Sequence, residues 1–205
     1  SMVTMPAELV PEGDLLKSND GVDIWLVPVA SFSDNTAYAA TKGLEFYYLH
    51  TTFLDDEENP TPRAYRRQLH STFEGLTFWG MYQHAIGLNY TENVTFRDVR
   101  IVGDGRSGGL GIDADHFHNM GTLRFEDLAI EDLETGISVP TQGDILISGG
   151  TFANQTDLRI MNPQLDVRSL HIEDVEFEDS SVFSEQTAIE TVSYTHLRAH
   201  ETTVY

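Results

Sequence analysis

Five short stretches share one pattern, apolar, any residue, Asp or Gly, small or apolar, any residue, apolar, and this pattern decides the fold. The copies are Phe73-Glu74-Gly75-Leu76-Thr77-Phe78, Phe96-Arg97-Asp98-Val99-Arg100-Ile101, Phe125-Glu126-Asp127-Leu128-Ala129-Ile130, Ile147-Ser148-Gly149-Gly150-Thr151-Phe152 and Ile172-Glu173-Asp174-Val175-Glu176-Phe177. Their starts lie 23, 29, 22 and 25 residues apart. A repeat of roughly 20 to 50 residues indicates a solenoid, in which each unit buries its apolar face against its neighbours.

The spacing within each copy indicates strands. Apolar residues at i, i+3 and i+5 fit two short strands with a bend between them, because side chains alternate along a strand and the bend resets the phase. Leucine-rich repeats share this spacing but need Asn or Cys at i+8. That position holds other residues here: Met81, Asp104, Leu133, Gln155 and Ser180.

A second strand block follows four of the copies. These blocks are Gly87-Leu88-Asn89-Tyr90, Gly111-Ile112-Asp113-Ala114, Gly136-Ile137-Ser138-Val139 and Asp157-Leu158-Arg159-Ile160. Several short strands per turn, joined by loops of variable length, resemble the right-handed parallel β-helix of the pectate-lyase-like family. The resemblance covers about residues 71–187. We therefore predict an all-β, right-handed parallel β-helix solenoid that is truncated at its C-terminus.

The remaining chain divides around this solenoid. Residues 1–22 are expected to be a lead-in segment, and residues 23–70 an N-terminal coil, marked by Gly43-Leu44-Glu45-Phe46-Tyr47, followed by an acidic, proline-containing loop. The β-helix is predicted over 71–191. Residues 192–202 resemble the translation of a transposase adapter used in sequencing libraries, so 192–205 is predicted to be a non-native tail. An uncapped last coil leaves unpaired backbone groups, which predicts that the tail is disordered, packs accidentally over that coil, or takes part in self-association through it.

Composition excludes several classes of function. The 205 residues include 33 acidic and 12 basic side chains, for a net charge of -21, which disfavours binding to nucleic acid or anionic lipid. There is no cysteine, so disulfides and thiolate chemistry are excluded. No apolar run is long enough to span a membrane. We expect an extracellular or cell-surface protein whose partner is a polysaccharide.

The strand phase predicts which side chains face outward. If Leu88, Ile112, Ile137 and Leu158 point into the core, the following residues point out on successive coils: Asn89, Asp113, Ser138 and Arg159. Asp113 and Arg159 should then lie on the order of 10 Å apart on one surface, with Asp115 on the same face. The resemblance implies Ca²⁺ bound by Asp113 and Asp115, and Arg159 and Asp113 as catalytic residues. The open alternative is a solvated acidic surface.

Histidines near this row suggest a second chemistry. His116 and His118 follow Asp115 within the longest repeat interval, and insertions in solenoids often map to the binding face. With Asp113 and Asp115 they could ligate a metal if the chain turns there, and His84 on the previous coil could join them. The alternative is that they are turn histidines that only form hydrogen bonds.

Substrate contacts are predicted from Asn89, His84, Arg63 and Arg66. The two arginines could hold a carboxylated or sulfated sugar bidentately, or could pair with the nearby acidic loop. Aromatic residues could stack on sugar rings, although most are expected in the core. Two functions remain: a carbohydrate-active enzyme, either a calcium-dependent polysaccharide lyase or a glycoside hydrolase, and a noncatalytic adhesin or stalk with a carbohydrate-binding face.

Overall fold

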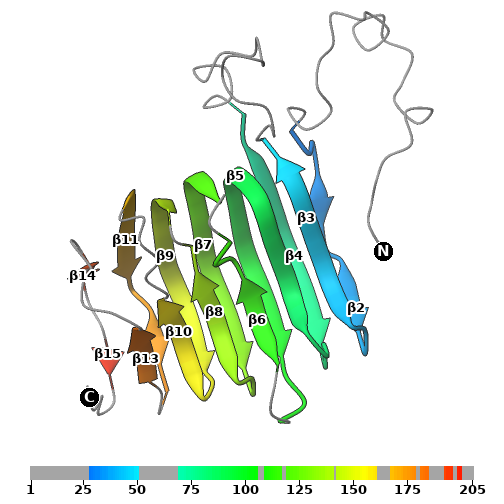
Figure 1. Ribbon diagram of the computed structural model, residues 1–205. Helices are drawn as coiled ribbons and strands as arrows, with labels where there is room; N and C mark the ends of the chain where they lie inside the picture. The colour runs from blue at the N-terminus through cyan, green and yellow to red at the C-terminus, as the bar shows by residue number, and fades with distance from the viewer. Residues whose placement is uncertain are drawn as a thin grey trace, which may run out of the picture.

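The computed structural model describes residues 28–50, 69–105, 109–116, 119–140, 142–160, 167–178, 181–184, 192–195 and 198–199. Within these ranges the chain forms strands and no helix. The strands stack in parallel, one turn beside the next, as a β-solenoid (Figure 1). The predicted all-β parallel solenoid is confirmed. The described residues contain no helix capable of crossing a bilayer.

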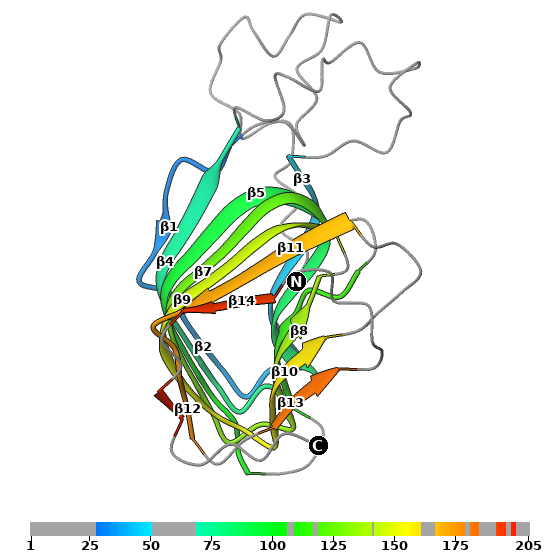
Figure 2. The same ribbon diagram turned by 90° about the vertical axis from the view of Figure 1, so that its left-hand side faces the viewer.

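The strands form two parallel sheets that share β5 (His84–Val102). Sheet A contains β1 (Phe32–Ser33), β2 (Thr36–Tyr38), β4 (Ser71–Trp79), the second half of β5, β7 (Met120–Glu131), β9 (Gln142–Ala153), β11 (Val167–Glu173), β12 (Glu176–Phe177), β14 (Val192–Thr195) and β15 (Arg198–Ala199). Sheet B contains β3 (Lys42–Leu49), the first half of β5, β6 (Leu110–Asp113), β8 (Thr135–Val139), β10 (Thr156–Ile160) and β13 (Ser181–Ser184). Figure 2 shows the two sheets on opposite sides of the coil.

The five repeat copies build the core of sheet A. Their first residues pair in register from coil to coil and are at most 1% exposed: Phe73, Phe96, Phe125, Ile147 and Ile172. The phenylalanine rings stack, with centroids 5.2 Å apart for Phe73 and Phe96 and 6.0 Å apart for Phe96 and Phe125. The predicted internal ladder is therefore confirmed over four successive turns.

The Asp or Gly in each copy is the bend. Backbone φ is positive at all five positions, which are Gly75, Asp98, Asp127, Gly149 and Asp174. Glycine adopts this conformation at no steric cost, and Asp is among the few other residues that tolerate it. The bend lets the residues at i, i+3 and i+5 all face inward, as the spacing requires.

Sheet B follows the predicted pattern with one difference in register. Ile86, and not Leu88, pairs with Ile112, and the row continues through Ile137 and Leu158. Both Ile86 and Leu88 are buried, so strand alternation alone permits either register. The predicted register of this coil is wrong by two residues, and positive φ at Tyr90 and Asn93 marks the corner between this strand row and the next repeat copy.

Strands before residue 50 add to both sheets on the N-terminal side of the repeat copies. Strands β1 and β2 pair with β4, and β3 pairs with β5 through Leu44 and Ile86. At the other end, β14 and β15 extend sheet A from β11 and β12. The described residues of the predicted tail, 192–195 and 198–199, thus pair with the coil before them, and the non-native origin of the tail stays a prediction. Self-association through this end stays a prediction.

Candidate functional site

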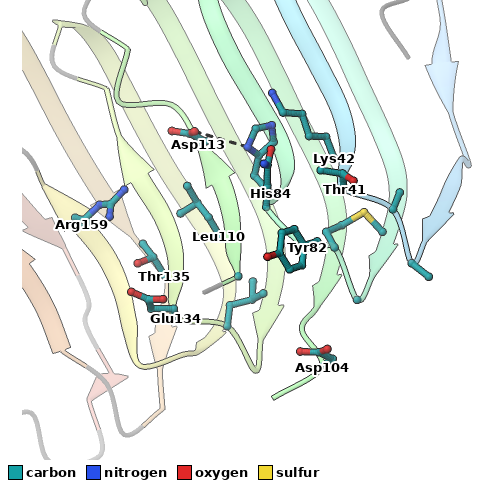
Figure 3. Close-up of a pocket in the computed structure, with 17 residues that line it drawn as sticks. Thr41, Lys42, Tyr82, His84, Asp104, Leu110, Asp113, Glu134, Thr135 and Arg159 are labelled. Atoms are coloured by element: carbon teal, nitrogen blue, oxygen red, sulfur yellow. Dashed lines mark ion pairs between the residues drawn. The ribbon is translucent and has the colours of Figure 1, made fainter. Parts of the chain in front are cut away.

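The outward row of sheet B brings the candidate residues together. Backbone pairing aligns one position of five successive coils: Glu45, Gly87, Asp113, Ser138 and Arg159. Stacked parallel strands lie about 4.8 Å apart, so a residue reaches its neighbours on both sides of this row. Figure 3 shows several of these side chains, with His84 and Asp113 facing each other. Asp113, Ser138 and Arg159 lie on consecutive coils, as the sequence predicts.

Asp113 and Asp115 form a carboxyl pair at the end of β6. The backbone N–H of the intervening residue, Ala114, donates to the carbonyl of Ser138 at 3.1 Å, and its side chain is buried. Both aspartates therefore lie on the outer side. Burial raises the pKa of Asp113 most strongly, and the charge of Asp115 and a hydrogen bond with Asp115 raise this pKa further. Asp113 therefore retains a proton more readily than an ordinary aspartate does.

Ser138 and Arg159 hold the second carboxylate. The Ser138 hydroxyl donates to Asp115 Oδ2 at 2.9 Å, and Arg159 donates to Ser138 Oγ from Nε and Nη2 at 3.2 Å. Arg159 Nη2 lies 3.7 Å from Asp115 Oδ2. The guanidinium of Arg159 and the hydroxyl of Ser138 therefore hold Asp115 in place beside Asp113.

A second group of polar side chains lies on the other side of Asp113. His84 Nε2 donates to Glu45 Oε2 at 2.6 Å, and Lys42 Nζ lies 2.9 Å from the same oxygen. Burial works to raise the pKa of Glu45, but hydrogen bonds from Lys42 and His84 outweigh it and lower this pKa. Because the carboxylate only accepts, the proton is on Nε2 of His84, whose Nδ1 lies 3.7 Å from Asp113 Oδ2.

Gly87 makes room for this arrangement. A Cβ at Gly87 would lie 2.6 Å from His84 Nε2 and 3.0 Å from Glu45 Oε2. Any larger residue would therefore displace the imidazole or the carboxylate. The missing side chain in the middle of the row lets His84 bridge the distance from Glu45 to Asp113.

A groove of about 940 Å³ opens over these strands. Its described lining combines polar side chains from β3, β5, β6, β8 and β10 with the turns that precede them: Ala39, Ala40, Thr41, Lys42, Gly80, Met81, Tyr82, Gln83, His84, Asp104, Gly109, Leu110, Asp113, Leu133, Glu134, Thr135 and Arg159. Figure 3 shows Tyr82 between His84 and Asp104. Tyr82 is 79% exposed, so its ring is available to a ligand in the groove.

Asn89 and His116 make contacts with other residues than the carboxyl pair of Asp113 and Asp115. Asn89 lies two residues beyond Gly87 and donates to Glu45 Oε1 at 3.1 Å, so it borders the site from a different row. The ring of His116 packs on Tyr90, with centroids 4.6 Å apart. His118, Arg63 and Arg66 lie outside the described residues, and their predicted roles stay predictions.

Asn119, the last residue of the polar stretch that begins at Asp113, connects coils. It is fully buried, and its amide donates to the carbonyls of Leu88 and Ala114 while its oxygen accepts from the N–H of Thr91. Buried polar groups need such partners. The polar stretch 113–119 therefore begins with the carboxyl pair and ends with Asn119, whose role is structural.

Sequence reasoning missed Lys42, Glu45 and Glu134. The signal for Glu45 was available, because Gly43-Leu44-Glu45 has the same form as Gly111-Ile112-Asp113 and pairs with the same row. Lys42 does not follow from this pattern, because residues three apart on a strand point to opposite faces, yet its ammonium reaches the carboxylate of Glu45. Nothing in the local pattern marks Glu134, which lies in a turn before β8.

Asp113 and Asp115 are of the ligand type that Ca²⁺ prefers, but their surroundings fit the ion poorly. Arg159 is 3.7 Å from one carboxylate and His84 is 3.7 Å from the other, so basic groups already stand beside both. Among the residues that the structure describes, no three His, Asp or Glu side chains are grouped as a metal site requires. Calcium and transition-metal binding stay predictions.

Comparison with known proteins adds no relative to this description. The chain matches no protein-family model, no curated protein and no solved structure. The class of protein that the fold defines is a parallel β-solenoid, and its candidate site is the groove over sheet B.

Proposed function

We propose that this protein is a carbohydrate-active β-solenoid enzyme that hydrolyses glycosidic bonds in the groove over sheet B. One observation carries the proposal: Asp113, whose pKa is raised, lines an open groove that also contains an exposed tyrosine, a guanidinium and a second carboxylate. Many glycoside hydrolases use a carboxyl group that stays protonated together with a second carboxylate. The groove extends over several coils, which suits an extended chain of sugars.

In this proposal Asp113 is the general acid. It gives its proton to the glycosidic oxygen as the bond from that oxygen to the anomeric carbon breaks. Water adds to the anomeric carbon and its proton passes to a carboxylate base, for which we propose Glu134, since it lines the same groove. Asp115 is hydrogen-bonded to Asp113 and so lies too near it to act from the opposite face of the sugar ring, and its part is to raise the pKa of Asp113.

The neighbouring side chains position these groups. Ser138 and Arg159 fix Asp115, and Glu45 fixes the tautomer of His84, which faces Asp113. A guanidinium keeps its charge in proteins. Arg159 therefore suits binding of a sugar hydroxyl better than proton abstraction, and for this reason we prefer hydrolysis to the elimination that the resemblance to pectate-lyase-like proteins implies.

Calcium has no step in this mechanism, although a calcium-dependent lyase acting on a polyuronate stays a prediction from the sequence. An extracellular or cell-surface location belongs to the proposal, because large polysaccharides are found there. The noncatalytic alternative, an adhesin or stalk with a carbohydrate-binding face, would use the same groove without the proton transfer.

The test is an assay of product chemistry. Purified protein is incubated with neutral, amino-sugar and acidic polysaccharides, with and without chelator, and new reducing ends and unsaturated uronates are measured separately. Reducing ends without unsaturation, lost in Asp113→Asn and retained in Arg100→Ala on the opposite sheet, support hydrolysis. Unsaturated product that needs calcium overturns hydrolysis in favour of a lyase. Binding without product overturns catalysis and favours the noncatalytic alternative.

A further inference from the structure

Tyrosine and tryptophan are distributed differently from phenylalanine in this fold. The most buried phenylalanines, Phe73, Phe96, Phe125 and Phe152, are at most 1% exposed. Tyr38, Trp79 and Tyr82 are 70%, 55% and 79% exposed. Most of the phenylalanines that the structure describes lie in the core, as expected, whereas these three rings do not. Large exposed rings are a feature of binding surfaces, where they stack on ligands.

One of the three exposed rings, that of Tyr82, lines the groove, and the other two directly precede lining residues in the sequence. Tyr38 and Trp79 end strands β2 and β4 and pair in register on adjacent coils. The residues directly after them, Ala39 and Ala40 on one coil and Gly80 and Met81 on the next, line the groove, as does Tyr82. Tyr82 is therefore the ring inside the groove, and Tyr38 and Trp79 are exposed rings on the strand ends that lead into its lining. We name Tyr38, Trp79 and Tyr82 the aromatic corner.

The charges in the groove select against an acidic ligand. In the described lining, each basic side chain has a carboxylate within 4 Å: Glu45 is 2.9 Å from Lys42 and 2.6 Å from His84, and Asp115 is 3.7 Å from Arg159. The same lining contains Asp104, Asp113 and Glu134. With a net charge of -21 over the whole chain, the field repels polyanions within a Debye length of the surface.

We propose that the aromatic corner is a sugar-stacking subsite and that the glycan of this protein carries no carboxylate or sulfate groups. The inference rests on the proposed function, because it names the substrate class of the same groove. Neutral sugars present an apolar ring face to an aromatic side chain and pay no electrostatic penalty here. Amino sugars are attracted in addition. A polyuronate gains no unpaired basic partner from the described lining and meets a repulsive field.

The test is affinity gel electrophoresis with xylan, galactomannan or β-glucan as neutral glycans, chitosan as the amino-sugar glycan, and pectate or alginate as acidic ones. We expect retardation by at least one glycan without acidic groups. For a neutral glycan the affinity should be almost independent of salt, because no charges pair across the interface. Tyr82→Ala should weaken binding about tenfold. Tyr82→Phe, which keeps the ring, is the matched control and should bind like the original protein.

The outcomes separate this inference from the proposed function. Tight binding to pectate or alginate at low salt overturns the substrate class, whether or not product forms. Binding that Tyr82→Ala and Trp79→Ala leave unchanged, with both variants folded, overturns the subsite. Binding of a neutral or amino-sugar glycan that depends on these rings, with no product from any polysaccharide, supports the subsite while the proposed hydrolysis fails. Absence of binding to every glycan class overturns the subsite.

Discussion

The two sheets of the solenoid use the same backbone pairing for different purposes. In sheet A the inward positions form an uninterrupted ladder of large apolar side chains, and the outward positions carry exposed ion pairs such as Arg97–Glu126. In sheet B the inward ladder is equally complete, but the outward row changes from coil to coil and carries Glu45, Gly87, Asp113, Ser138 and Arg159. Repetition of the core therefore permits variation on one outer face, which is where we propose the chemistry lies.

The largest expected effect comes from breaking the ladder of sheet A. Phe125 is fully buried between Phe96 and Ile147, so Phe125→Ala leaves a cavity between two full neighbours. We expect the free energy of unfolding to fall by roughly 3 to 5 kcal/mol. Chemical denaturation measures it. A loss below 1 kcal/mol would contradict the importance of the ladder.

The second-largest effect is a loss of stability at acidic pH, and it depends on the buried side chain of His50. The Nδ1–H of His50 donates to the carbonyl of Glu92 at 2.8 Å, and Nε2 accepts from the hydroxyl of Ser71, which itself accepts from the N–H of Val29. Burial is the main reason that the pKa of His50 is lowered from 6.5. The unfolded chain therefore binds more protons as the pH falls below 6.5, and the folded state loses stability there.

The expected loss through His50 is at most about 1.4 kcal/mol per pH unit, and it ends below the pKa of the folded state. Thermal unfolding of the original protein and of His50→Gln between pH 7.5 and about 5 measures it. The variant should be less stable at neutral pH and less sensitive to acid. Equal pH dependence of the two proteins would show that His50 is not the group responsible.

Ionisation of Asp113 should change the stability with pH in the opposite direction to ionisation of His50, and by a smaller amount. Its pKa is raised above 3.8, so the folded state binds a proton more tightly than the unfolded chain and loses stability as the pH rises through this window. Asp113→Asn cannot ionise, so it should unfold at a slightly higher temperature than the original protein at pH 7. The difference should vanish at pH 3. A variant destabilised at pH 7 would mean that the ionised carboxylate supports the fold.

The smallest effect is expected on the outer face of sheet A. Arg100 Nη2 lies 2.9 Å from Glu131 Oε1 on the next coil, and the two side chains are 63% and 43% exposed. Exposed ion pairs contribute little after solvent screening, so Arg100→Ala should change the free energy of unfolding by less than about 1 kcal/mol. Glycan binding should be unchanged. A larger loss would mean that the outer face of sheet A contributes to stability as the core does.

The sequence alone determined the solenoid, the ladder and the positions of the bends. This is possible because side-chain alternation and the conformational freedom of Gly and Asp are local properties, and the repeat makes each of them visible five times. The order along the chain also placed Asp113 and Arg159 on one outer face. These features depend on spacing within a coil and on the stacking of one coil on the next.

Only the tertiary structure decided how the outward side chains interact. The register of the coil with Ile86 and Leu88 was ambiguous because both residues are apolar and two apart, so Gly87 could not be aligned with Asp113 from the sequence. The contacts of Glu45 with Lys42 and His84, and of Ser138 with Asp115, join different strands through side-chain rotamers that no local pattern specifies. The raised pKa of Asp113 likewise depends on burial and on neighbouring charge, which exist only once the coils are stacked.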